Sequence, residues 1–262
     1  MKRVLVTGLN SYIGNSFAEF CKDDFLIDKI SLRGDDWQNL DFSVYDSILH
    51  VAGIAHTSRN SDLENLYYTV NVDLTLKVAE KAKKAGVSQF VFLSSIIVYG
   101  DNNAAVGQVK VIDEYTKPNP DDFYGNSKLQ AENGLATLES DCFKVAIIRP
   151  PMIYGEGSKG NYSKLEKLAK IYFVFPSIEN ERSVLYIDKL SCELKAIILK
   201  QQKGIFRPQD DVYFCTSKFI KTYRESLGKK TFLIGIFNPL IRAVSKRLVM
   251  LRKMFGSLVY KK

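Results

Sequence analysis

Five short apolar runs alternate with longer amphipathic stretches over the first 150 residues. Their continuous apolar character is typical of strands buried on both faces of a parallel sheet. The runs are Val4–Val6, Phe25–Leu32, Ser47–Val51, Phe90–Leu93 and Val145–Ile148. Between Tyr68 and Gly86, apolar residues at helical spacing mix with lysines, and Gly86 is placed to end a helix. Strands that alternate with helices predict an α/β fold with a doubly wound parallel sheet.

The same alternation indicates where the chemistry should lie and where the chain divides. In doubly wound sheets, ligands bind beyond the carboxyl ends of the strands. The loops that follow the expected strands begin at Thr7, Arg33, Ala52, Ser94 and Arg149. After Arg149 the chain becomes rich in glycine and proline. We therefore expect a sheet domain over residues 1–150, a smaller C-terminal substrate lobe over 151–228 and a tail over 229–262.

Charge and cysteine content exclude several classes of protein. The net charge is +8, but nine basic and no acidic residues lie from Lys229 onward, so residues 1–228 carry a net charge of −1. A nucleic-acid-binding body is therefore not expected. The four cysteines are widely spaced, which argues against a disulfide framework or a zinc site. The first strand begins at the N-terminus and no apolar run reaches about 18 residues, so a cytoplasmic protein is expected.

The segment VTGLNSYIG, at residues 6–14, has the order of strand, tight turn and helix that a phosphate-binding turn needs. Backbone N–H groups and the positive end of the helix dipole converge there. Ser11 stands where a glycine is usual, and its hydroxyl could itself donate to a phosphate. The cofactor contacts expected from this turn come from Gly8, Asn10, Ser11, Tyr12, Ile13 and Gly14.

Tyr124 and Lys128 form the strongest local signal for catalysis. Their four-residue spacing places both on one helix face, where an ammonium favours the ionised form of a phenol. Ser94 and Ser95 follow an apolar strand and would face the same ligand region. By itself, this four-residue spacing also fits two solvent-exposed residues on one helix that have no catalytic role.

With VTGLNSYIG, HVAGIAH, VNVDLTL, LSSIIVYG, YGNSK and IIRPPMIYG in this order, the chain resembles the extended short-chain dehydrogenase/reductase family. The resemblance is to its nucleotide-sugar epimerase/dehydratase branch and spans roughly residues 3 to 215. It implies a Rossmann domain and a catalytic set of Ser95, Tyr124 and Lys128. Tyr124 would move the proton of the sugar hydroxyl, while Lys128 would hold the nicotinamide ribose and lower the pKa of Tyr124. Asn71 would fix neighbouring backbone.

The resemblance also implies further cofactor and substrate contacts. Asp41 and Phe42 would lie beside the adenine, and the backbone of Ala52 and Gly53, with Pro151, would contact the cofactor. Asn161 and Arg182 would bind the diphosphate of the substrate, and Ser95 would contact its sugar. Arg182 could instead form a surface ion pair with Glu179 or Glu181. Phe175 and Pro176 either flank a uracil or belong to a core and a turn.

The cofactor is expected to be NAD or NADP. Arg33 ends the second expected strand, where an acidic residue would bind the ribose of NAD, and an arginine there favours the 2′-phosphate of NADP. Asp35 and Asp36 follow directly and could take the acidic role. Because of Arg33, NADP is favoured over NAD.

Ile96 and Ile97 reduce the number of reaction types that the resemblance allows. The resemblance implies that dehydratases carry an acid pair at these places, so dehydration is disfavoured and oxidation and reduction at a ring carbon remain. We predict an epimerase that inverts C4 of a UDP-hexose or UDP-N-acetylhexosamine through a 4-keto intermediate, acting as a homodimer in surface polysaccharide synthesis. The alternatives are an NADPH-dependent UDP-4-keto-sugar reductase and a cofactor-sensing regulator. A regulator would be expected to have lost its catalytic set, which is present.

Two features fall outside the resemblance. His50 and His56 have no metal-ligand spacing, so structural or cleft-lining roles are expected and no metal site is predicted. In the basic tail, apolar residues at steps of four and three predict one amphipathic helix. They are Leu240, Val244, Leu248, Leu251, Phe255 and Leu258. This helix either packs on its own domain or lets residues 236–262 contact an anionic membrane.

Overall fold

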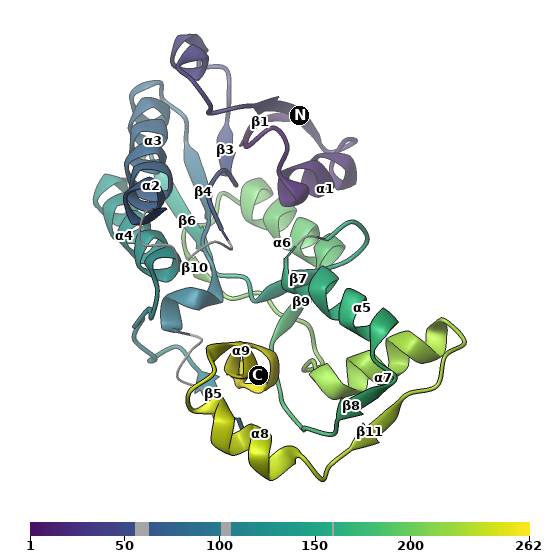
Figure 1. Cartoon of the computed structure of the whole chain (residues 1–262). Helices are drawn as coiled ribbons and strands as arrows, with labels where there is room; N and C mark the ends of the chain where they lie inside the picture. Colours follow the sequence, from purple (N-terminus) through teal and green to yellow (C-terminus); the bar gives the residue numbers. More distant parts are fainter. Residues whose placement is uncertain (56–62, 101–105, 159) are drawn as a thin grey trace. The chain divides into compact units, whose positions relative to one another are not determined.

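The computed structural model describes residues 1–55, 63–100, 106–158 and 160–262. These residues form two compact units, each assembled from separate stretches of the chain (Figure 1). The first unit comprises Met1–Val98, Asp122–Pro150 and Tyr186–Pro208. The second comprises Tyr99–Asp121, Pro151–Leu185 and Gln209–Lys262. The chain therefore passes between the units several times.

The first unit is built on a parallel sheet with the strand order β10-β6-β4-β3-β1-β2. Its strands are β1 (Lys2–Thr7), β2 (Phe25–Ile30), β3 (Ser47–His50), β4 (Gln89–Leu93), β6 (Lys144–Ile148) and β10 (Gly204–Phe206). The five predicted strands and the doubly wound parallel sheet are confirmed, and β10 is an additional edge strand. The strand order reverses between β1 and β3, and this switch point is where such sheets bind ligands.

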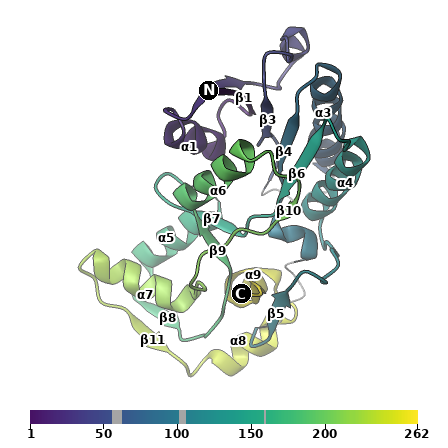
Figure 2. The ribbon, with the colours of Figure 1, turned by 180° about the vertical axis from the view of Figure 1, so that it is seen from behind.

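Helices cover both faces of this sheet, as Figures 1 and 2 show from opposite sides. On one face α1 (Tyr12–Phe20) packs against α6 (Ile187–Leu199). On the other face α3 (Leu74–Lys84) packs against α4 (Phe123–Leu138). The helix expected between Tyr68 and Gly86 is present, although a π-helical turn, η3 (Thr69–Asp73), separates α3 from the short α2 (Glu64–Tyr68). Short 3₁₀ turns, η1 (Asp36–Asn39) and η4 (Ile96–Tyr99), follow β2 and β4.

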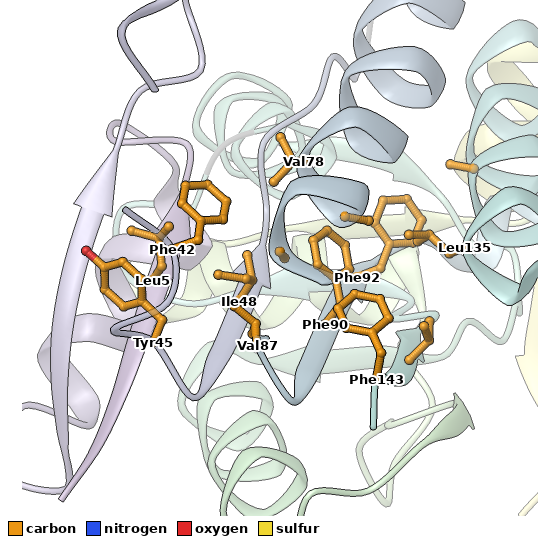
Figure 3. Close-up of a cluster of buried hydrophobic side chains, with 14 of the residues drawn as sticks. Leu5, Phe42, Tyr45, Ile48, Val78, Val87, Phe90, Phe92, Leu135 and Phe143 are labelled. Carbon is orange, nitrogen blue, oxygen red and sulfur yellow. The ribbon is translucent and has the colours of Figure 1, made fainter. Parts of the chain in front are cut away.

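The core of the first unit lies between the sheet and the helices α3 and α4 (Figure 3). Strand residues such as Leu5, Ile48 and Phe90 are fully buried there against Val78 and Leu135 of the helices. Burial on both faces explains why the strands read as continuous apolar runs. Gly134 permits the close approach of the two helices, because a Cβ there would lie 2.7 Å from Leu76 Cδ2.

The second unit combines three strand pairs with four helices among the described residues. The pairs are β5 (Val109–Ile112) with β12 (Ser257–Tyr260), β8 (Val174–Pro176) with β11 (Phe232–Ile234), and β7 (Met152–Tyr154) with β9 (Val184–Tyr186). The helices are α5 (Asn161–Ile171), α7 (Thr216–Ser226), α8 (Asn238–Ser245) and α9 (Val249–Phe255). Its core gathers Ala169, Phe175, Ile178, Ile220 and Phe255. Within the described parts of the chain, every helix is too short or too polar to span a bilayer.

Two sequence expectations differ from this organisation. The expected boundary at residue 150 is too simple, because Tyr99–Asp121 belongs to the second unit and Tyr186–Pro208 returns to the first. The prediction of one amphipathic helix in the tail is wrong, because the segment forms α8, α9 and β12. Phe255 and Leu258 are buried in the second unit and not on a free helix face. Helical spacing alone could not show that Leu258 pairs with Lys110 in a sheet.

Candidate active site

Two glycines allow the backbone to pack tightly at the turn after β1. Gly8 has a φ of +90°, and a Cβ there would lie 3.2 Å from Ala52 Cα. A Cβ on Gly14 would lie 2.9 Å from Val6 Cγ1, so this glycine lets α1 pack closely on β1. Close backbone approach at the start of a helix is what a bound diphosphate requires. The turn therefore fits the dinucleotide that the sequence predicts.

Ser11 has a structural role that explains its presence in this turn. It is the N-cap of α1, and its Oγ accepts a hydrogen bond from the backbone N–H of Gly14 at 3.3 Å. An N-cap serine satisfies a backbone donor that the helix leaves unpaired. Its own hydroxyl hydrogen is not used in this bond, so the predicted contact between Ser11 and a phosphate stays open.

Asn71 fixes the loop that follows β3. Its Oδ1 accepts from Ile54 N at 2.8 Å, and its Nδ2 donates to Ile54 O at 3.1 Å and to Ser127 Oγ at 2.9 Å. The side chain is fully buried on the π-helical turn η3. Asn71 thus ties the Ala52–Ile54 loop to helix α4, which confirms that it fixes neighbouring backbone. A Cβ on Gly53 would lie 3.0 Å from Asn71 Oδ1, so a side chain there would require this clamp to shift.

Lys128 also lies beside Gly53. Its Nζ donates to Leu93 O at 2.8 Å, lies 4.6 Å from the centre of the Phe92 ring, and would be 3.4 Å from a Cβ on Gly53. The side chain is buried, and burial lowers the pKa of Lys128 to about 8, partly offset by the negative charge of Glu132. The helix thus places a cation beside the loop that the cofactor is predicted to contact.

Tyr124 is paired with Ser95. A side-chain hydrogen bond from Ser95 lowers the pKa of Tyr124, but burial of the phenol outweighs it and raises that pKa to about 12. Backbone hydrogen bonds hold Ser95 on both sides, because Ser94 N donates to Ile148 O at 2.7 Å and Ile96 N donates to Pro150 O at 2.9 Å. The structure therefore pairs Tyr124 with Ser95 and leaves the phenol protonated near neutral pH. The expected lowering of this pKa by Lys128 is not seen, because burial, Ser95, Asp122 and Tyr67 are the groups that shift it. Perturbed pKa values on neighbouring groups are typical of functional sites.

Sequence reasoning missed a buried ion pair beneath these residues. Arg149 Nε donates to Glu132 Oε1 and Oε2 at 3.1 and 3.2 Å, and Ser94 Oγ donates to the same carboxylate. Both charged side chains are at most 5% exposed. Glu132 lies four residues after Lys128, so its helical spacing was visible in the sequence, but its buried partner was not. Because Ser94 is bonded to Glu132, Ser95 is the serine left to face Tyr124.

His50 has the structural role that was expected. It is buried at the end of β3, where its Nδ1 lies 3.1 Å from Thr7 Oγ1 and its Nε2 lies 3.0 Å from Thr75 Oγ1. Burial lowers the pKa of His50 to about 3, so the ring is neutral at physiological pH. His56 lies outside the described residues.

The residues predicted to contact the adenosine lie beyond β2. Arg33 is exposed, as are Asp35 and Asp36. Asp41 accepts from Ser43 N at 2.9 Å, and hydrogen bonds with Ser43 lower the pKa of its carboxyl. The Phe42 side chain is buried in the core, so a contact with adenine would have to come from its backbone. The contacts of these residues with the cofactor stay predictions.

The remaining predicted contacts belong to the second unit. Pro151 is buried, Asn161 is the first residue of α5, and Arg182 Nε donates to Gly256 O at 2.9 Å. Phe175 belongs to the core of this unit, which is one of the two roles expected for it, whereas Pro176 is the last residue of strand β8 and does not form the expected turn. Binding of a substrate diphosphate by Asn161 and Arg182 stays a prediction.

Comparisons with known proteins agree with the geometry of the first unit. The model of the NAD dependent epimerase/dehydratase family matches residues 4–188. A UDP-glucose 4-epimerase from Vibrio cholerae is 29% identical over 262 residues, which covers 90% of this chain and 79% of the relative. An N-acetyl-alpha-D-glucosaminyl-diphospho-ditrans,octacis-undecaprenol 4-epimerase from Escherichia coli O157:H7 is 28% identical over 249 residues, covering 87% and 73%. The solved structure of a dTDP-4-dehydrorhamnose reductase from Bacillus anthracis in complex with NADP has a TM-score of 0.75 at 17% identity, covering 100% of this chain and 90% of that one. At that identity the likeness concerns the fold.

Proposed function

Because the chain belongs to the NAD dependent epimerase/dehydratase family, we propose that it inverts C4 of a UDP-hexose or UDP-N-acetylhexosamine through a 4-keto intermediate. The chain is an NAD(P)-dependent enzyme of the nucleotide-sugar epimerase/reductase group. The observations that support the proposal most are the hydrogen bond between Ser95 and Tyr124 and the position of Lys128 Nζ beside Gly53. A scaffold that only senses a cofactor would not need this set.

The glycines of the turn, Tyr124 and Ser95 would each have a separate role in the reaction. Gly8 and Gly14 would admit the diphosphate of NAD or NADP, which supplies the acceptor and donor of hydride when bound. Tyr124 would take the proton of the sugar hydroxyl and return it, while Ser95 would hold the sugar oxygen in line with the phenol. General acid–base help of this kind contributes about 10²–10⁴-fold to a rate.

Lys128 would hold the nicotinamide ribose and supply positive charge near the phenol. Since the pKa of Tyr124 is about 12 in the structure, a nearby ammonium is needed to make its ionised form accessible near neutral pH. The pKa of Lys128 is about 8, so this ammonium is present at neutral pH and is lost in more alkaline solution. We therefore expect activity to fall above about pH 8.

The test is to mix purified protein with UDP-glucose or UDP-N-acetylglucosamine, without added cofactor, and to follow C4 inversion by NMR. Tyr124→Phe should lower the rate by at least 100-fold. Tyr115→Phe, which removes a phenol that is 82% exposed, is the matched control and should be unchanged. If Tyr124→Phe and the wild type invert either sugar at the same rate, the proposed role of Tyr124 is wrong.

A 4-keto-sugar reductase is the second candidate, because Arg33 is exposed just beyond β2, where it could meet the 2′-phosphate of NADP. The discriminating assay adds NADPH and a UDP-4-keto-sugar and follows absorbance at 340 nm. Stoichiometric loss of NADPH without inversion in the first assay would establish the reductase. Inversion without net use of cofactor would establish the epimerase.

The name of the Escherichia coli relative adds a substrate class, a sugar diphosphate carried on a polyprenol. The same NMR assay with a lipid-linked N-acetylglucosamine diphosphate tests it, and inversion of that substrate alone would replace UDP as the recognised carrier. We further propose that the enzyme acts in the cytoplasm, as a homodimer, in surface polysaccharide synthesis. Contact of residues 236–262 with a membrane also stays a proposal.

A further inference from the structure

The second unit exposes apolar side chains at the end of α5 and in the segment leading into β8, on β11, and from there to the start of α8. The side chains that form it are each at least 51% exposed, and Ile236 reaches 78%. They are Ile171, Tyr172, Phe173, Phe232, Ile236, Phe237 and Leu240. Soluble proteins seldom expose so many large apolar side chains on adjacent segments without a binding partner. We refer to these seven residues as the β8–β11 surface.

Backbone pairing holds these segments side by side. Phe232 N donates to Phe173 O at 2.9 Å, and Phe232 is the register partner of Val174, which is also exposed. The next pair, Phe175 and Leu233, alternates to the opposite side and packs into the core of the second unit. β8 and β11 therefore have one buried side and one exposed side.

The start of α8 is tied to the same strands. Ser177 N donates to Ile234 O at 3.1 Å, and Asn238 Nδ2 donates to Ser177 O at 2.7 Å. Ile241 faces the core, while Phe237 and Leu240 are exposed. In both views β11 runs alongside β8 and leads into α8 (Figures 1 and 2).

Basic residues flank the β8–β11 surface at both ends. The buried Arg224 donates to Lys170 O and to Lys230 O, each at 3.3 Å, which brings the exposed Lys170 and Lys230 together at one end. Beyond α8, Lys246 and Arg247 are exposed. No acidic residue occurs from Lys229 to the last residue. The nearest acidic residue of α7, Glu225, is 3.9 Å from Lys221 in an ion pair of its own helix.

We propose that the β8–β11 surface docks on an anionic lipid bilayer. Aromatic and aliphatic side chains between flanking cations match the interface of such a bilayer, where rings insert at the headgroups and lysines attract the negative surface. A second copy of the chain fits this surface less well, because a two-fold contact would bring the basic flanks of both copies together. Of the stripe expected from the tail sequence, Leu240 belongs to this surface, whereas Phe255 and Leu258 are buried.

The test is co-sedimentation of the full chain with vesicles of phosphatidylcholine containing 30% phosphatidylglycerol, beside vesicles of phosphatidylcholine alone, at low salt. The wild type should pellet with the anionic vesicles only and be released by high salt. Phe173→Ser with Phe237→Ser should weaken binding at least tenfold, as should Lys170→Gln with Lys230→Gln. Val212→Ser, at a side chain that is 75% exposed outside this surface, is the matched control and should bind like the wild type.

Circular dichroism of each variant checks that it is folded, and sedimentation equilibrium gives its oligomeric state. The proposal is overturned if the wild type stays in the supernatant, or if folded variants pellet as the wild type does. It is also overturned if Phe173→Ser with Phe237→Ser converts a dimer into a monomer, because the surface would then be an interface between copies. None of these results depends on which sugar the enzyme inverts.

Discussion

Replacing Arg149 by methionine should destabilise the first unit severely, because it would remove the counter-charge that is hydrogen-bonded to the buried carboxylate of Glu132 and leave only the charge interaction with Lys128. The two side chains are 5% and 3% exposed, and the Nε of Arg149 makes two hydrogen bonds to the carboxylate. Removing one member of a buried ion pair typically costs about 3–5 kcal/mol of the free energy of unfolding. The loss should be at the upper end, since only Ser94 Oγ would remain as a described donor to the carboxylate.

Urea unfolding followed by the fluorescence of Trp37 measures this cost. Trp37 is the single tryptophan of the chain and lies in the core of the first unit, so its signal reports on the unit that contains the ion pair. Lys203→Met, which breaks the exposed ion pair of Lys203 with Glu139, is the control and should leave the midpoint unchanged. The double variant Arg149→Met with Glu132→Met removes both buried charges and should recover most of the loss.

Two results would refute this reasoning. A cost below about 1 kcal/mol for Arg149→Met would show that water or another group compensates the carboxylate, contrary to its burial. A double variant as unstable as the single one would show that the loss comes from packing of the arginine side chain and not from an unpaired charge.

Three further predictions test single residues. As pH falls from about 6.5 to about 3, the free energy of unfolding should decrease, because His50 stays neutral in the folded chain and is protonated once unfolded; His50→Gln should flatten this dependence in urea unfolding. Ser11→Gly should change stability little, because glycine is tolerated at N-caps, while it weakens cofactor binding in calorimetry; an unchanged Kd would remove Ser11 from the phosphate site. Arg33→Glu should lower affinity for NADPH much more than for NADH, and an equal effect on both would contradict its predicted contact with a 2′-phosphate.

The sequence predicted the first unit well because its strands are buried on both faces. Val145–Ile148 reads as an apolar run for that reason, whereas β10 has only three residues and two of them are exposed. The strands of the second unit have only three or four residues, and each pairs with a segment far away in the chain. Local patterns carry no information on such pairings, which is why Leu258 was assigned to a helix.

The catalytic set could be predicted because spacing and motif order carry it, as Tyr124 and Lys128 show. The pair of Glu132 and Arg149 could not, since a charged residue at helical spacing is usually solvent-exposed. Its burial depends on β6 ending beside α4, which is a property of the tertiary structure. The exposed β8–β11 surface likewise depends on which apolar residues the fold leaves uncovered.

The pairing of β5 with β12 affects the order in which the two units become complete during synthesis. The first unit has all its strands once Pro208 has been made, whereas β5 waits for a partner that ends at Tyr260. At about 5–20 residues per second, the intervening stretch takes roughly 3–10 s to translate. During that interval Val109 and Val111 lie on an unpaired strand edge, a known starting point for aggregation. The nascent chain therefore passes through a state in which the first unit, which is predicted to bind the cofactor, is complete. In that state β5 of the second unit still lacks its partner strand β12.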